Sequence, residues 1–103
     1  MDKEFLEKEI IRELKNVYDP EIPVDIYELG LIYEIRIDEN TNVYIKMTLT
    51  APGCPVAGSL PEEVKQKVKR IKGVNQVVVD LVWEPAWNKD MMSDEAKLQL
   101  GFL

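Results

Sequence analysis

The chain has 103 residues, with 13 Lys and Arg against 19 Asp and Glu, and a formal net charge of −6 at pH 7. This length is typical of one domain, so we expect a single domain over residues 1–103. The acidic balance argues against nonspecific nucleic-acid binding, whose footprint is a basic face. The absence of histidine excludes a Ser-His-Asp triad, a Cys-His pair and any zinc site that needs an imidazole. One cysteine cannot close an intrachain disulfide. There is no apolar leader and no apolar run of about 18 residues, so we expect a cytoplasmic protein that does not span a membrane.

The first half of the chain predicts a helix followed by a hairpin. Apolar residues at helical spacing over residues 4–17 predict the helix, with Asp2 as its N-cap. Two prolines, Pro20 and Pro23, end it and begin a loop that runs to Gly30. Residues 31–37 and 43–50 alternate with period two on either side of an Asn-rich turn, which predicts an antiparallel hairpin. In the first strand, this alternation groups Leu31, Tyr33, Ile35 and Ile37 against Ile32, Glu34 and Arg36.

The second half predicts a helix, a strand and a short final helix. The second helix begins near Ser59, where Ser59 and Glu62 form a capping-box pattern, and Gly73 follows its end. Residues 74–83 predict a third strand, which a helical crossover would make parallel to the second. The last helix begins at Ser93 and ends at Gly101. The sequence therefore predicts an α+β fold in the order α-β-β-α-β, with a small three-stranded mixed sheet packed with helices and a short C-terminal helix.

Cys54 is the first candidate for chemistry. It lies between Gly53 and Pro55, in a turn after a strand and before a helix, where backbone N–H groups favour a thiolate. The alternative interpretation is a small buried apolar side chain, as many unpaired cysteines are. One thiolate cannot hold an iron–sulfur cluster, which needs about four ligands. Any cluster bound here would take further ligands from a second chain, a partner or small thiols.

The other candidate residues are polar groups near this turn or in the first loop. Asp19, Glu21 and Asp25 lie in the loop, where acidic side chains are usually solvated or bonded to the backbone. Thr50 lies on the same strand face as Thr48 and precedes Cys54 closely; threonine is also common in strands for packing reasons. No histidine accompanies them, so no complete catalytic constellation is present and we do not expect an enzyme.

Two further segments each have two possible interpretations. The apolar segment from Trp83 to Met92 either folds back over the sheet or docks a partner, because Trp and Met are enriched at such surfaces. The second helix is crowded with cations (Lys65, Lys67, Lys69, Arg70 and Lys72) and is either a solvated face or a surface for an acidic partner.

Four strings in this order resemble one family closely. They are residues 19–24 (Asp-Pro-Glu-Ile-Pro-Val), residues 28–33 (Glu-Leu-Gly-Leu-Ile-Tyr), residues 48–55 (Thr-Leu-Thr-Ala-Pro-Gly-Cys-Pro), and residues 83–87 (Trp-Glu-Pro-Ala-Trp) with Met91-Met92-Ser93. The chain resembles the SufT/PaaD-like family of iron–sulfur assembly proteins over nearly its whole length.

The resemblance implies an accessory role in iron–sulfur cluster assembly or delivery to apo-proteins. It implies that Cys54 is the reactive thiol and a transient cluster ligand, that Asp19, Glu21 and Asp25 are the acidic loop positions, and that Thr50 is the strand threonine. Asp25 is the acid that we expect beside Cys54. We expect no tightly bound cofactor, but a transient or dimer-bridging iron–sulfur cluster. The expected partners are the assembly machinery, apo client proteins and a second copy of the chain in a homodimer.

Two other functions stay open from the sequence. The PaaD-like branch implies a specialised maturation partner of a multicomponent aromatic-ring oxygenase. A Cys-nucleophile enzyme would require a carboxylate to activate Cys54, since there is no imidazole.

Overall fold

The computed structural model describes residues 2–19, 22–50 and 59–102. The elements are α1 (Lys3–Leu14), β1 (Ile32–Ile37), β2 (Val43–Met47), α2 (Leu60–Lys69), β3 (Val77–Leu81), a 3-10 turn η1 (Lys89–Met91) and α3 (Asp94–Leu100). This order confirms the predicted α+β class and adds η1, which the sequence analysis did not anticipate. The first helix ends three residues earlier than expected, and the third strand is confined to the centre of its predicted range.

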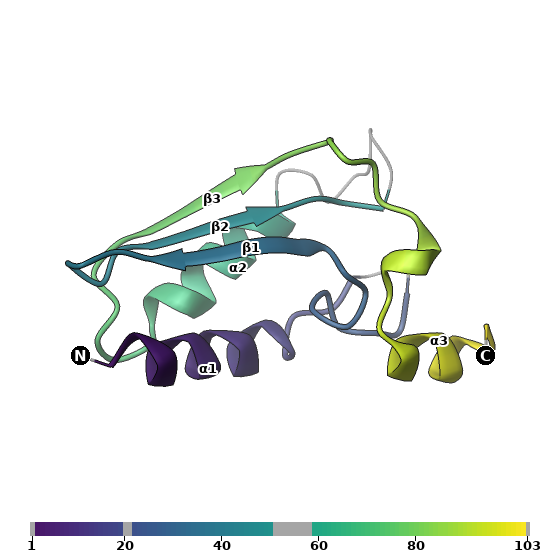
Figure 1. Ribbon diagram of the computed structural model, residues 1–103, viewed down its shortest axis with the longest axis horizontal. Coiled ribbons are helices and arrows are strands. Elements are labelled where there is room, and N and C mark those ends of the chain that lie inside the picture. Colours follow the sequence, from purple (N-terminus) through teal and green to yellow (C-terminus); the bar gives the residue numbers. More distant parts are fainter. Residues whose placement is uncertain (1, 20–21, 51–58, 103) are drawn as a thin grey trace.

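The three strands form one mixed sheet in the order β1-β2-β3. β1 and β2 form the predicted antiparallel hairpin, and β2 runs parallel to β3 with Val43 opposite Val77. α2 makes the crossover between the parallel strands. α1 and α2 lie on the same face of the sheet, while the last segment of the chain reaches past the far end of the sheet (Figure 1).

The core fills the space between the sheet and these two helices, and β2 is its central strand. Val43, Ile45 and Met47 on one side of β2 are each at most 1% exposed. They face the apolar stripes of the helices, which are Leu6, Ile10 and Leu14 on α1 and Leu60, Val64 and Val68 on α2. Burial of this apolar surface is the main stabilising contribution to the fold. Among the described helices, none is long and apolar enough to cross a membrane.

The predicted helix caps can be compared with the structure at each helix end. Asp2 caps α1 by accepting from the Glu4 N–H at 2.9 Å, and Ser93 caps α3 by accepting from the Ala96 N–H at 3.1 Å. Gly101 ends α3 in the left-handed region, with φ of 86°. The capping box at Ser59 was wrong: its side chain makes no cap hydrogen bond. Its backbone is already helical, with φ −99° and ψ −36°, whereas a capping serine needs extended geometry.

A β-bulge in β1 corrects the predicted faces of that strand. The register shifts between Ile32, opposite Met47, and Glu34, opposite Lys46. Ile32 therefore shares the core face with Ile35, and Tyr33 occupies the bulge instead of the core row. One extra residue reverses the alternation locally, which a period-two pattern cannot show.

Candidate functional site

The residues singled out from the sequence fall partly outside the described chain. Cys54 and Glu21 lie outside the described residues, so their predicted roles stay predictions. Asp19, Asp25 and Thr50 are described. They come from the first loop and from the stretch of chain that leaves β2.

Asp25 organises the backbone of the first loop. Tyr18 and Asp25 form an isolated antiparallel bridge, and the Ile26 N–H donates to the Val17 carbonyl at 2.8 Å. The Asp25 carboxylate accepts from the Glu28 N–H at 3.0 Å, as a helix-capping residue would, and so holds the turn over residues 25–30. Burial raises the pKa of this carboxyl above its ordinary value of 3.8, against the opposing effect of the Glu28 N–H. The structure thus gives Asp25 a structural role, and its predicted position beside Cys54 stays a prediction.

Asp19 lies just after the bridge and is only 4% exposed. Burial of a loop carboxylate to this degree is unusual, since acidic side chains are rarely buried unless they have partners. The solvated alternative considered for the loop acids is therefore wrong for Asp19. Asp19 and Asp25 flank the same narrow loop, which the bridge at Tyr18 draws together.

Thr48 and Thr50 continue the chain beyond β2. The Thr48 N–H donates to the Leu31 carbonyl at 2.9 Å, while the Met47 carbonyl accepts from the Val82 N–H at 2.8 Å, so this stretch is held from both sides. Thr48 is fully buried, and its hydroxyl makes no hydrogen bond to any described group. Thr50 is half-buried. The buried Thr48 hydroxyl and the half-buried Thr50 make this the polar end of an otherwise apolar strand.

Tyr33 lies next to Thr48 at this end of the sheet. Its hydroxyl donates to the Pro85 carbonyl at 2.7 Å and lies 3.5 Å from the Met91 sulfur. Burial raises the pKa of the Tyr33 phenol, and the Thr48 hydroxyl opposes that shift.

The C-terminal segment folds back, as one of the two alternatives for Trp83 to Met92 anticipated, but it covers the first loop at the end of the sheet and not the sheet itself. The Trp87 indole N–H donates to the Leu29 carbonyl at 2.7 Å, and the Ser93 N–H donates to the Glu28 carbonyl at 2.9 Å. Gly30 has φ of 82°, and a Cβ at this position would collide with the Met91 carbonyl. Trp83 is still 38% exposed, so only the part of the segment from Trp87 onward is packed as a cover.

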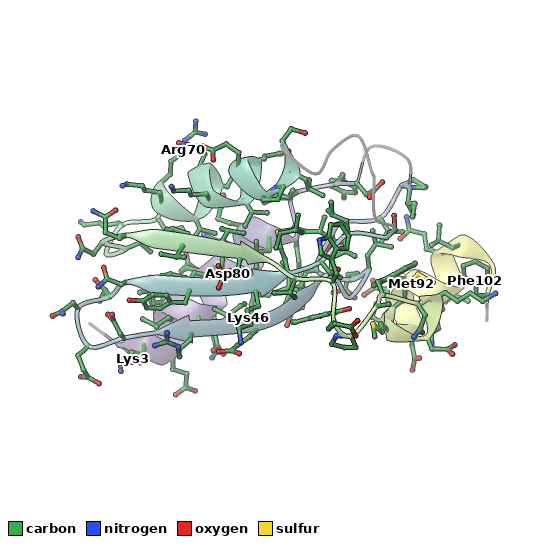
Figure 2. All side chains as sticks on the ribbon, turned by 90° about the horizontal axis from the view of Figure 1, so that it is seen from above. Lys3, Lys46, Arg70, Asp80, Met92 and Phe102 are labelled. Carbon is green, nitrogen blue, oxygen red and sulfur yellow. The ribbon has the colours of Figure 1, made fainter. Side chains whose placement is uncertain are left out.

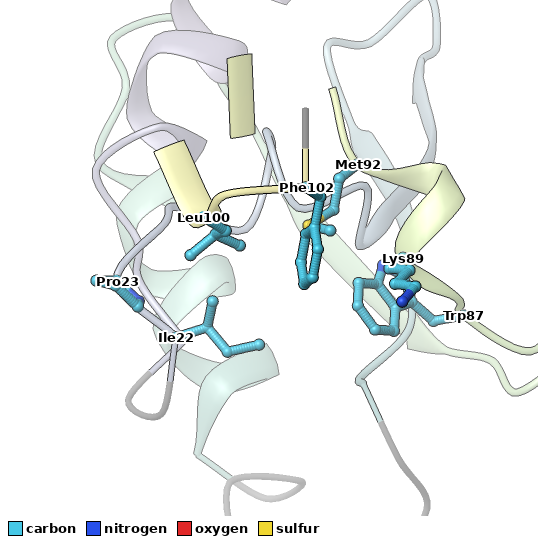
Figure 3. Close-up of a pocket in the computed structure, with 7 residues that line it drawn as sticks. All are labelled: Ile22, Pro23, Trp87, Lys89, Met92, Leu100 and Phe102. Carbon is cyan, nitrogen blue, oxygen red and sulfur yellow. The ribbon is translucent and has the colours of Figure 1, made fainter. Parts of the chain in front are cut away.

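A cavity of about 440 Å³ lies where this cover meets the first loop. Figure 3 shows its walls: Ile22 and Pro23 from the loop face Leu100, Phe102, Met92 and Trp87 from the C-terminal segment. Lys89 is the one charged side chain among the described lining residues, and its Nζ lies 5.0 Å from the centre of the Phe102 ring. The Trp87 N–H already donates to Leu29, so the described walls of this pocket present apolar surfaces and one cation.

No group of three or more acidic or cysteine side chains that could hold a metal ion occurs within residues 2–19, 22–50 and 59–102. The sequence analysis missed Tyr33 and the Gly30–Met91 contact. Gly30 was the available signal, because a glycine with positive φ often marks a close approach of two backbones.

The described residues define a class of protein: a small α+β domain in which a three-stranded mixed sheet is backed by two helices and closed at one end by the chain's own C-terminal segment. A profile of the iron-sulfur cluster assembly protein family matches residues 7–80. The chain belongs to this family, which confirms the resemblance derived from its four strings.

The similar proteins cover most or all of this chain. A Porphyromonas gingivalis protein named Fe-S protein maturation auxiliary factor is 55% identical over 100% of both chains. The Bacillus subtilis Fe-S protein maturation auxiliary factor YitW is 42% identical over 96% of this chain and 97% of its own length. A Mycobacterium tuberculosis iron-sulfur cluster carrier protein is 33% identical over 84% of this chain, which corresponds to only 21% of that protein.

Solved structures share the fold. A Bacillus anthracis domain of unknown function has a TM-score of 0.89 and 42% identity, and covers 97% of this chain and 95% of that one. A conserved hypothetical protein from Thermotoga maritima has a TM-score of 0.78 and 40% identity, with 91% and 92% coverage. Both solved structures thus share the fold of this chain over more than nine-tenths of its length.

Proposed function

We propose that this protein is an accessory factor in iron–sulfur cluster assembly or in cluster delivery to apo-proteins, and that it is not itself an enzyme. The observation that carries the proposal is the 55% identity, over the full length of both chains, to a protein named as an Fe-S protein maturation auxiliary factor. Family membership over residues 7–80 supports the same role. The relatives include maturation auxiliary factors and a cluster carrier protein, so they are consistent with a role in either assembly or delivery.

In this proposal Cys54 supplies one thiolate to a cluster in transit. Transfer is a ligand exchange: the Cys54 thiolate leaves an iron as a client thiolate replaces it, so no electron is gained or lost. Connectivity supports a site at the end of the sheet, since Cys54 follows Thr50 by four residues, which span at most about 14 Å when extended. The half-buried Thr50 on one side and Ser59 on the other are the described polar residues nearest in the chain to such a site.

The cluster is cargo in this proposal, and its remaining ligands come from outside one chain. Four thiolates are the usual complement of a cluster, and the chain has one cysteine. A second copy of the chain, small thiols or a partner's cysteines would complete the set. The partners are accordingly the assembly machinery and apo clients, with a homodimer as the bridging form.

The test is maturation of a client iron–sulfur enzyme in a strain that lacks this protein. Wild type restores client activity, and Cys54→Ser fails to do so while accumulating to the same level. Ser93→Ala is the control, because it removes a helix cap and leaves the thiol intact. Full activity with Cys54→Ser would refute the thiol role, and absence of any maturation defect in the deletion strain would refute the accessory function itself.

Anaerobic reconstitution with iron and sulfide distinguishes a cluster that bridges two copies of this chain from a role in which the chain itself binds no cluster. A coloured species of dimer mass that is lost in Cys54→Ser supports a bridging cluster. A colourless monomer contradicts cluster carriage by this chain alone and moves the role to docking of the machinery.

A further inference from the structure

We propose that the exposed cations of α2 and the loop after it form a docking surface for an acidic segment of another protein. This basic surface consists of Lys65, Lys67, Lys69, Arg70 and Lys72. The inference does not depend on Cys54 or on the proposed cluster chemistry. It names an interaction surface that lies apart from the C-terminal cover and the first loop.

Charge along the chain is strongly segregated. Residues 64–79 contain five cations and no carboxylate. The remainder of the chain then has 13 − 5 = 8 cations against 19 carboxylates, a balance of −11. Two of the remaining carboxylates, Glu62 and Glu63, are exposed in the first turn of α2, so α2 with the loop after it has a balance of 5 − 2 = +3. This end of α2 is still positive on an acidic chain, and complementary charge steers association with a partner of opposite sign.

The structure keeps these cations available. Lys65, Lys69, Arg70 and Lys72 are exposed and Lys67 is half-buried. Within the described chain, none of the five forms an ion pair, whereas four of the eight other cations do. The one polar contact recorded for them is from the Lys69 Nζ to the neutral Gln76 amide oxygen at 3.1 Å.

The orientation of α2 turns this surface outward. Leu60, Val64 and Val68 point into the core, which leaves the cations on the solvent side of the helix. Figure 2 shows Arg70 at the α2 edge of the molecule, on the side opposite Lys3 of α1. Lys65 and Lys69 are one helical turn apart, a spacing of about 6 Å that suits neighbouring carboxylates of a partner chain.

Helix stability explains only part of this pattern. Cations in the last turn of a helix interact favourably with its dipole, which accounts for Lys67 and Lys69. Lys65 lies in the middle of α2 and Lys72 lies beyond its end, so neither benefits in this way. An acidic protein segment fits better than a nucleic acid, because a long polyanion on this small surface would also meet the acidic remainder of the chain.

The test uses a defined probe: a 12-residue peptide in which glutamate alternates with serine, titrated into ¹⁵N-labelled full-length protein at low salt. The basic-surface variant carries Lys65→Gln, Lys69→Gln, Arg70→Gln and Lys72→Gln. A matched control carries Lys3→Gln, Lys8→Gln, Lys46→Gln and Lys89→Gln, which are four exposed cations elsewhere with the same change in net charge. The double variant Lys65→Gln/Lys72→Gln spares the last turn of α2 and covers the case in which the quadruple variant does not fold.

We expect saturable shifts confined to amides of residues 60–72, and a dissociation constant raised about tenfold by the basic-surface variant and less than threefold by the control. A peptide with glutamine in place of glutamate should not bind. The inference is overturned if no saturable binding occurs, if both quadruple variants weaken binding equally, or if the shifts map elsewhere. It is also overturned in favour of nucleic acid if decauridylate binds the same amides as tightly as the peptide. Loss of peptide binding together with normal client maturation would remove this inference and leave the proposed function standing.

Discussion

The contact between Gly30 and Met91 gives the sharpest prediction about the C-terminal cover. Gly30→Ala introduces a methyl group where the backbone has φ of 82° and where the Met91 carbonyl occupies the space of a Cβ. The left-handed conformation alone costs about 1–2 kcal/mol for a residue with a Cβ. Relief of the collision requires η1 to move, which strains the hydrogen bond from Trp87 to Leu29, for about another 1 kcal/mol.

Gly101 provides a matched control for this substitution. It has nearly the same φ, 86°, but a Cβ there meets nothing within 4 Å. Gly101→Ala therefore carries only the conformational penalty, about 1 kcal/mol or less at a helix end close to the chain terminus. The difference between the two variants isolates the close approach of the first loop to the C-terminal segment.

The assay is urea unfolding at 25 °C, followed by circular dichroism and by Trp87 fluorescence in a Trp83→Phe background. We expect Gly30→Ala to lower the free energy of unfolding by about 2–3 kcal/mol and to shift the Trp87 emission to longer wavelength in the native state. Gly101→Ala should leave the emission unchanged. If Gly30→Ala costs no more than Gly101→Ala, the cover is not held by this contact and the reasoning fails.

Three further predictions concern buried polar groups. Asp25→Asn keeps an oxygen that can accept from the Glu28 N–H but removes the titrating carboxyl. Because the pKa of Asp25 is raised in the folded protein, the wild-type free energy of unfolding falls as the pH rises from 3.8 through the folded pKa. Denaturation measured from pH 3.5 to 6 should show no such fall in the variant. An identical pH profile would contradict the assignment. Thr48→Val replaces a buried hydroxyl that has no described hydrogen bond with a methyl group, so we expect no loss, or a gain of up to about 1 kcal/mol, in the same unfolding assay; a loss above about 1 kcal/mol would show that the hydroxyl is satisfied. Trp87→Phe keeps an aromatic ring but removes the pyrrole part of the indole and with it the N–H that donates to Leu29. It should cost about 1–2 kcal/mol, with faster hydrogen exchange in residues 87–93 and no change in α1.

The secondary structure followed from local patterns to a large extent. The stripe from Leu6 to Leu14 and that from Leu60 to Val68 need only helical spacing, and a hairpin followed by a helical crossover leaves few topologies for three strands. The parallel pairing of β2 with β3 was therefore predictable without coordinates. The capping box at Ser59 failed because a cap depends on backbone angles at one residue, which the residue types alone do not specify.

For the candidate site, the sequence identified the residues, while the structure was needed to show their burial and contacts. Residue types and their order were sufficient to identify Cys54, Asp19, Asp25 and Thr50 as candidates and to assign the family. Only the tertiary structure showed that Asp19 is buried and that Asp25 caps a turn, because burial depends on which distant segment covers a loop.

The amino-acid sequence by itself determined the elements, their order, the family and the charge contrast of α2, since each depends on neighbours along the chain. The tertiary structure alone decided that a bulge removes Tyr33 from the core row and that Trp87 reaches back to Leu29. Both outcomes rest on contacts between residues more than a dozen positions apart, whose formation depends on the packing of the whole chain and leaves no periodic signal in either segment.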